Sequence, residues 1–157
     1  MIRLQPMDDP TFEAWREASV REYAQDKVDS GNWLAADAVE RSAREFADML
    51  PDGRSTAGHE FCSMVTENGV RVGIAWFASE DRPFGRVVFI YDIAVDPEYR
   101  RMGYAQAALG EIEAYAREHD CVAVQLHVFG GNSGARRLYQ RAGYIETDVT
   151  MVKTVTG

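Results

Sequence analysis

An apolar strand, a turn, a helix and a second apolar strand follow one another in the second half of the chain, and they constrain the fold more than any other feature. Residues 86–95 form an apolar run that breaks at Asp96-Pro97, and a helical pattern then covers residues 103–119. A second apolar run occupies residues 121–129. Strands joined through a single crossover helix pair in parallel. We therefore predict a parallel pair formed by 86–95 and 121–129, with the helix packed on the sheet.

Hydrophobic periodicity and turn residues predict the other elements. They are a strand at 2–7, helices at about 10–30 and 34–50, a polar loop at 52–58, strands at 60–66 and 70–78 joined by an Asn68-Gly69 turn, a helix ending near Ala142-Gly143, and one or two strands within 144–155.

The composition indicates one globular domain. The chain has 157 residues, of which 46% are hydrophobic, and no apolar run is long enough to cross a bilayer. The first residues lack an apolar signal region, so we expect a cytoplasmic protein without a membrane partner. Cys62 and Cys121 lie in strand-like segments without metal-ligand spacing, which favours buried thiols and no metal site.

The charge of the chain bears on two classes of partner, nucleic acids and cationic molecules. The net charge of −8 argues against nucleic-acid binding, which needs clustered basic residues. Residues 8–48 contain eleven acidic and five basic residues, so the acidity is concentrated in the N-terminal third. Such a surface can steer a cationic partner, although solvated helix faces are the simpler interpretation.

The turn at residues 96–103 has the composition of a phosphate site. N–H groups in the first turn of a helix lack internal partners and lie at the positive end of the helix dipole. Arg100 and Arg101 add positive charge, and Gly103 lets the backbone approach a ligand closely. Alone, Arg-x-x-Gly-x-Ala is equally typical of an ordinary helix start.

A second motif decides between these interpretations. Arg100-x-x-Gly103-x-Ala105 followed by Asn132-x-x-Ala135-x-x-x-Tyr139-x-x-x-Gly143-Tyr144 resembles the GCN5-related N-acetyltransferase (GNAT) superfamily. The motifs occur in the family's order, whereas the N-terminal half resembles it only in its order of elements. The resemblance implies a single N-acetyltransferase domain over residues 1–157. Its expected fold is a mixed, mainly antiparallel α/β sheet of six or seven strands, with four helices and a splayed central parallel pair.

The resemblance also implies acetyl-CoA bound between the splayed strands. In the family the pantetheine arm pairs with the first of these strands and the pyrophosphate lies on the turn and helix start. The matching positions are Ile93, Ala94 and Val95 for the arm, and Arg101, Met102, Gly103, Tyr104, Ala105 and Gln106 for the pyrophosphate, with Arg100 beside them. Asn132 is expected to contact the CoA arm, and Ala135 is small where the cofactor passes.

Tyr139 is the expected general acid. Amine attack on a thioester expels a thiolate, and a phenol near the sulfur can supply the proton. Ala135 and Tyr139 share one face of their helix, which can direct the phenol toward the gap between the strands. Simple packing of Tyr139 on the sheet is the structural alternative.

Two residues are candidates for the group that deprotonates the acceptor. In ribosomal-protein acetyltransferases of the family a glutamate lies five residues before the motif asparagine, and that position here is His127, whose neutral imidazole is a competent base. The structural alternative is that His127 tethers its strand by a hydrogen bond to the backbone. Some relatives use a glutamate on the fourth strand, where Asp92 is the only carboxylate of this chain. Asp92 can alternatively bind the ammonium while water carries the proton away, and Tyr91 is a weaker third candidate.

These residues predict an enzyme that transfers an acetyl group from acetyl-CoA to a primary amine in a ternary complex. No acyl-enzyme is expected, because neither cysteine has a nucleophile's setting. The acceptor is a small-molecule or peptide amine, and many relatives are homodimers. The alternative is a CoA-binding module that senses acyl-CoA through a protein partner without turnover.

Overall fold

The computed structural model describes residues 1–156 and divides into two compact units, Met1–Leu126 and His127–Gly157, which we describe separately. The first contains β1 (Ile2–Pro6), α1 (Asp9–Asp29), α2 (Ala38–Met49), β2 (His59–Thr66), β3 (Arg71–Arg82), β4 (Gly85–Val95), α3 (Tyr104–Glu118) and β5 (Ala123–Leu126). The second contains α4 (Ser133–Arg141). Whether residues 1–157 act as one domain stays a prediction.

The first unit is built on a five-stranded sheet in the order β1-β2-β3-β4-β5. Neighbouring strands are antiparallel except β4 and β5, which pair in parallel. The predicted crossover through α3 is therefore confirmed, and the fold class is the expected mixed α/β sheet with four helices. The strand count is lower than the six or seven predicted.

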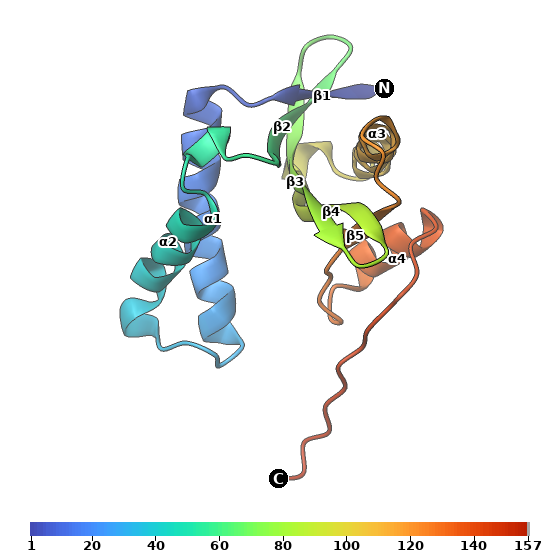
Figure 1. Ribbon diagram of the computed structural model, residues 1–157. Coiled ribbons are helices and arrows are strands. Elements are labelled where there is room, and N and C mark those ends of the chain that lie inside the picture. Colours follow the sequence, from blue (N-terminus) through green and yellow to red (C-terminus); the bar gives the residue numbers. More distant parts are fainter. Residues whose placement is uncertain (157) are drawn as a thin grey trace. The chain divides into compact units, whose positions relative to one another are not determined.

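Helices cover both faces of this sheet. Figure 1 shows α1 and α2 on one side and α3 on the other. On the α1 side, Phe12 and Trp15 pack against Phe61 and Trp76 from the strands, and all four side chains are buried. On the α3 side, Leu109 and Ile112 are fully buried. Truncating a buried aromatic side chain of this kind costs about 3–5 kcal/mol, so the aromatic cluster anchors α1 to the strands.

The hairpin between β3 and β4 is longer than predicted. We expected β3 to end at Ala78 because the residues that follow are charged, yet it continues to Arg82 and pairs there with Gly85. Its charges are compensated locally, since Arg82 pairs with Glu80 at 2.7 Å and Arg86 with Asp81 at 3.3 Å. The charged residues after Ala78 therefore belong to an extended hairpin rather than to a loop.

The prediction of strands within residues 144–155 is wrong. In the second unit the chain beyond Tyr144 carries no strand as far as residue 156. The strand predicted at 121–129 is also shorter, because β5 covers only Ala123–Leu126. Alternating apolar residues form a strand only where another strand's edge accepts their hydrogen bonds, and the described part of this unit provides none.

Candidate functional site

The candidate site begins where β4 and β5 part. Their parallel pairing runs from Val87 opposite Ala123 to Ile90 opposite Leu126 and then stops. β4 continues to Val95 and there pairs only with β3. Along residues 91–95 one edge of β4 thus carries backbone N–H and C=O groups without a strand partner among residues 1–156. An extended ligand bearing amides can satisfy such groups by acting as an added strand.

A β-bulge lies at the start of this segment. Trp76 is opposite Asp92 and Phe77 is opposite Ile90, so Tyr91 is an extra residue in β4. A bulge bends its strand and re-aims side chains. Here it lets two consecutive residues reach the side of the sheet covered by α1: Tyr91 stacks on Trp76 at 4.6 Å between ring centroids, and Asp92 contacts Trp15.

Asp92 is a carboxylate held within aromatic surroundings. The indole Nε1 of Trp15 donates a hydrogen bond to its Oδ2 at 3.0 Å, and the Trp15 ring lies 5.2 Å from that of Trp76. Burial raises the pKa of Asp92, while the hydrogen bonds from Trp15 and from the backbone of Ile93 act in the opposite direction. Carboxylates in such low-dielectric settings are common where a cation is bound or a proton moves.

Tyr91 is poorly suited to act as a base. Burial and a hydrogen bond that its hydroxyl donates to Glu80 raise the pKa of Tyr91 to about 12. Glu80 is in turn paired with Arg82 at 2.7 Å. The phenol therefore stays protonated at neutral pH and acts as a fixed donor to Glu80.

Sequence reasoning missed Gly73, which controls how closely β3 and β4 approach. It lies in β3 opposite Val95, and a Cβ added there would be 2.4 Å from the carbonyl oxygen of Ala94 and 2.9 Å from the Sδ of Met64. Only glycine fits beside the strand segment that we expect to hold the pantetheine arm. A glycine flanked by apolar strand residues was a signal of such an approach.

Sequence reasoning also gave no role to His59. Its Nδ1 accepts a hydrogen bond from the indole Nε1 of Trp76 at 3.0 Å, and its ring lies 5.8 Å from that of Tyr91. Burial lowers the pKa of His59, whereas Glu80 acts in the opposite direction. The imidazole therefore extends the aromatic cluster that surrounds Asp92.

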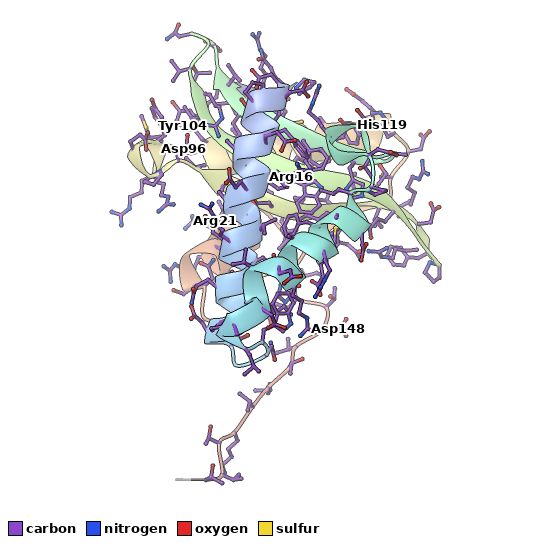
Figure 2. All side chains as sticks on the ribbon, turned by 90° about the vertical axis from the view of Figure 1, so that its left-hand side faces the viewer. Arg16, Arg21, Asp96, Tyr104, His119 and Asp148 are labelled. Carbon is purple, nitrogen blue, oxygen red and sulfur yellow. The ribbon has the colours of Figure 1, made fainter. Side chains whose placement is uncertain are left out.

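The turn after β4 forms the predicted helix start. The backbone N–H of Asp96 donates to the carbonyl of Val72 at 2.8 Å, which ties the turn to β3. Arg101 and Gly103 have left-handed backbones, with φ of 63° and 83°. Figure 2 shows Asp96 and Tyr104 at the same end of the sheet, with His119 at the opposite end.

The N-terminus of α3 has no side-chain cap. The helix begins at Tyr104, so the N–H groups of its first turn point away from the helix without intrahelical acceptors. Gly103 at the cap has only the terminal methyl of Met1 within 4 Å of an added Cβ, at 3.7 Å. Arg100 and Arg101 are exposed beside this turn, and the Nε of Arg100 donates to the carbonyl of Val95 at 3.2 Å. These groups can receive an anion such as a pyrophosphate.

The second unit holds the remaining predicted residues. Asn132 caps α4, because its Oδ1 accepts a hydrogen bond from the N–H of Ala135 at 3.2 Å. The ring of Tyr139 lies 6.0 Å from that of Tyr144, and the ring of His127 lies 5.0 Å from that of Phe129. The capping role of Asn132 was not predicted, and the proposed roles of Asn132, His127 and Tyr139 at the cofactor stay predictions.

The structure confirms the expected burial of Cys62 but not that of Cys121. Cys62 is buried, and burial raises the pKa of its thiol to about 12. Cys121 is half-buried and free. Within residues 1–156 no cluster of histidine, cysteine and acidic residues is arranged to hold a metal ion, and no helix there is long and apolar enough to cross a membrane.

Comparison with known proteins adds an independent line of support. A family model described as "Acetyltransferase (GNAT) family" matches residues 7–144. The chain is 37% identical to the uncharacterized N-acetyltransferase YycN of Bacillus subtilis (strain 168), over 97% of both chains. The crystal structure of YycN, described as a putative acetyltransferase, superposes with a TM-score of 0.88 over 100% of both chains.

More distant solved structures share the fold alone. A predicted acetyltransferase from Clostridium acetobutylicum, solved with acetyl-CoA, is 19% identical with a TM-score of 0.63 over 99% of this chain and 97% of that one. AAC(6')-Iy, solved with the bisubstrate analogue CoA-S-monomethyl-acetylneamine, is 16% identical with a TM-score of 0.62 over 100% of this chain and 99% of that one.

Proposed function

Because the chain belongs to the acetyltransferase (GNAT) family of acetyl-CoA-dependent acyltransferases, we propose that it moves the acetyl group of acetyl-CoA onto a primary amine in a ternary complex. One observation carries the proposal: the unpaired edge of β4 over residues 91–95 leads directly into an uncapped helix N-terminus. The extended amide arm of CoA would pair with the strand edge, and the pyrophosphate at the end of the arm would lie at the helix N-terminus that follows. A strand-like ligand without phosphate would leave the helix start unused.

The cofactor contacts follow from this match. The backbone of Ile93 to Val95 pairs with the pantetheine arm, and an N–H in this segment stabilises the charge that develops on the thioester oxygen. The turn from Arg100 to Gln106 receives the pyrophosphate. Asn132 and Ala135 at the start of α4 contact the arm as it leaves the thioester.

Asp92 is the acceptor-side residue of the proposal. Its carboxylate lies one residue before the arm-binding segment, and its surroundings of indole and phenol rings suit an ammonium group, which is attracted by both carboxylates and aromatic faces. His127 takes the proton that the ammonium must lose before attack. Tyr139 gives a proton to the departing thiolate, so that the products are an amide and free CoA.

The acceptor class is a small cationic amine or a peptide amine. AAC(6')-Iy was solved with an analogue that joins CoA to acetylneamine. A mycothiol acetyltransferase of Propionibacterium freudenreichii is 34% identical over 77% of this chain, which spans 36% of that protein. These relatives support amines on sugar-like or thiol-bearing small molecules as the first acceptors to test.

The experiment combines cofactor binding with turnover. We expect calorimetry to detect CoA binding, and release of free CoA to depend on one amine of a panel of polyamines, peptides, aminoglycosides and amino sugars. Tyr139→Phe should lower kcat by about 100-fold or more while the Kd for CoA changes less than about twofold. Tyr115→Phe is the matched control, because this tyrosine lies on α3 and contacts Glu60. An unchanged kcat in Tyr139→Phe, or no heat on adding CoA, would contradict the proposal.

A further inference from the structure

A hydrogen bond between Trp76 and His59 fixes the protonation state of the imidazole. The indole Nε1 of Trp76 donates to the Nδ1 of His59 at 3.0 Å, so Nδ1 carries no proton and the proton of the neutral ring lies on Nε2. Trp76 is 5% exposed, and within residues 1–156 its indole N–H has no hydrogen-bond acceptor other than His59. A proton on Nδ1 would leave this buried N–H unsatisfied, so the contact requires a neutral His59.

The backbone before β2 holds His59 in place. The N–H of His59 donates to the carbonyl of Thr56 at 3.2 Å, and the carbonyl of Gly58 accepts from the N–H of Ser79 at 3.0 Å. Gly58 has a left-handed backbone, with φ of 82°, which a residue with a side chain rarely adopts. The imidazole is therefore anchored on one side by this turn and on the other by Trp76.

Trp76 lies at the centre of the rings around Asp92. Its ring stacks on that of Tyr91 with 4.6 Å between centroids, and it meets the ring of Trp15 edge-on at 5.2 Å. Trp15 in turn donates the hydrogen bond that holds the Asp92 carboxylate. A change in the orientation of Trp76 would consequently disturb both the ring stacked on it and the donor to Asp92.

Glu80 is the charged group that acts on His59 in the described chain. Burial lowers the pKa of His59 below its usual 6.5, although Glu80 acts in the opposite direction. Glu80 already accepts a hydrogen bond from the hydroxyl of Tyr91 and pairs with Arg82 at 2.7 Å. A positively charged imidazole would lose Trp76 and would be attracted to Glu80, where it would compete with Tyr91. One proton on His59 thus acts against two contacts of the ring cluster.

We propose that His59, as the neutral Nε2–H tautomer, is a positioning residue: it orients Trp76 and thereby the rings in which Asp92 receives the ammonium of the acceptor. The place of the acceptor rests on the proposed function, whereas the contact between His59 and Trp76 does not. The partners of His59 precede the segment 93–106 that we assign to CoA. Loss of the contact should therefore weaken the use of the amine and leave the binding of CoA unchanged.

NMR on the full chain tests the contact without a substrate. The ¹⁵N signals of the His59 ring, identified by their absence in His59→Asn, should show the Nε2–H tautomer above its pKa. The indole N–H signal of Trp76 should titrate with the same pKa in the native chain. This titration should disappear in His59→Asn, because the asparagine Oδ1 can take the place of Nδ1 without gaining a proton. An Nδ1–H tautomer, or an indole signal that does not follow His59, would overturn the inference.

Kinetics test the consequence with the amine of the panel that gives the highest turnover. His59→Leu should raise the KM for this amine about tenfold, with less than about a twofold change in the Kd for CoA. His59→Asn should restore most of the KM and make the acid limb of log(kcat/KM) against pH shallower by about one unit of slope. An unchanged KM in His59→Leu, or an unchanged slope in His59→Asn, would count against the positioning role. A chain that acetylates no amine contradicts the proposed function instead, and the NMR titration then decides the inference alone.

Discussion

In the proposed mechanism, Asp92 serves chemistry at the expense of stability. Its pKa lies above the usual 3.8 because of burial, so the folded chain holds the proton more tightly than the unfolded chain. The fold therefore loses stability as the pH rises through this pKa. We expect Asp92→Asn, which keeps an oxygen for Trp15, to raise Tm at about pH 7.5 and to lose this advantage toward about pH 3.

The same variant should lose most of its activity, because an amide cannot pair with an ammonium. Differential scanning fluorimetry across this pH range and a CoA-release assay measure the two effects. A lower Tm at neutral pH would show that the carboxylate stabilises the fold, and a difference in Tm that does not depend on pH would show that ionisation of Asp92 does not set the stability.

Trp15 positions the Asp92 carboxylate through its indole N–H. Trp15→Phe keeps an aromatic ring in the cluster and removes the donor, so we expect a loss of about 1–3 kcal/mol in the free energy of unfolding. Trp33→Phe is the matched control, because Trp33 is equally buried and its indole N–H has no hydrogen-bond partner in the described chain. Urea denaturation measures the free energy of unfolding of both variants. Only Trp15→Phe should also shift the acid limb of the pH–rate profile upward.

At the scale of elements, Gly73 sets how closely β3 approaches β4, the strand that contains the proposed arm-binding segment. Gly73→Ala would place a methyl group 2.4 Å from the Ala94 carbonyl oxygen, so the strands must separate at a cost of about 1–3 kcal/mol. Because Ala94 lies in the proposed arm-binding segment, the Kd for CoA should rise by about tenfold, the equivalent of one lost hydrogen bond. Chemical denaturation and calorimetry measure these two changes.

Gly110→Ala provides the contrast. Gly110 lies inside α3 with nothing within 4 Å of an added Cβ, so alanine there should stabilise the protein by about 0.5–1 kcal/mol. Its Kd for CoA should stay unchanged. If Gly73→Ala bound CoA as the native chain does, the close approach of β3 and β4 would not matter for the cofactor.

The elements that could be predicted from the sequence are those specified by local pattern. The crossover from β4 through α3 to β5 and the turn ending at Gly103 are local, and both are confirmed. The bulge at Tyr91, the bond between Trp15 and Asp92, and the constraint at Gly73 depend on cross-strand register or on residues far apart in sequence. The prediction of strands at 144–155 is wrong because an alternating apolar pattern indicates a strand without indicating which strand it pairs with.

At the scale of the whole molecule, the acidic N-terminal third lies mainly on α1 and α2. Several of its charges are paired within one helix, as in Arg16 with Glu13 and Arg21 with Glu17, and Figure 2 shows both arginines on α1. Such exposed pairs contribute little to stability. The unpaired excess still creates a negative field on the side of the sheet that carries Asp92.

We expect this field to accelerate the binding of a cationic acceptor. Its kcat/KM should fall several-fold as salt rises from about 0.05 to 0.5 M, while kcat stays constant, because salt screens exposed charges. Glu22→Lys with Asp26→Lys should weaken this salt dependence. Glu111→Lys with Glu118→Lys, on α3 across the sheet, is the matched control, and an equal effect of both pairs would assign the dependence to net charge alone.

The unpaired edge of β4 has a consequence for regulation. In the proposed complex, backbone pairing with the pantetheine arm does not involve the acetyl group, so this edge would hold free CoA as firmly as acetyl-CoA. Free CoA should consequently be a competitive product inhibitor with respect to acetyl-CoA. Where acetyl-CoA and CoA together saturate the site, the rate would then follow the ratio of acetyl-CoA to CoA rather than the concentration of either.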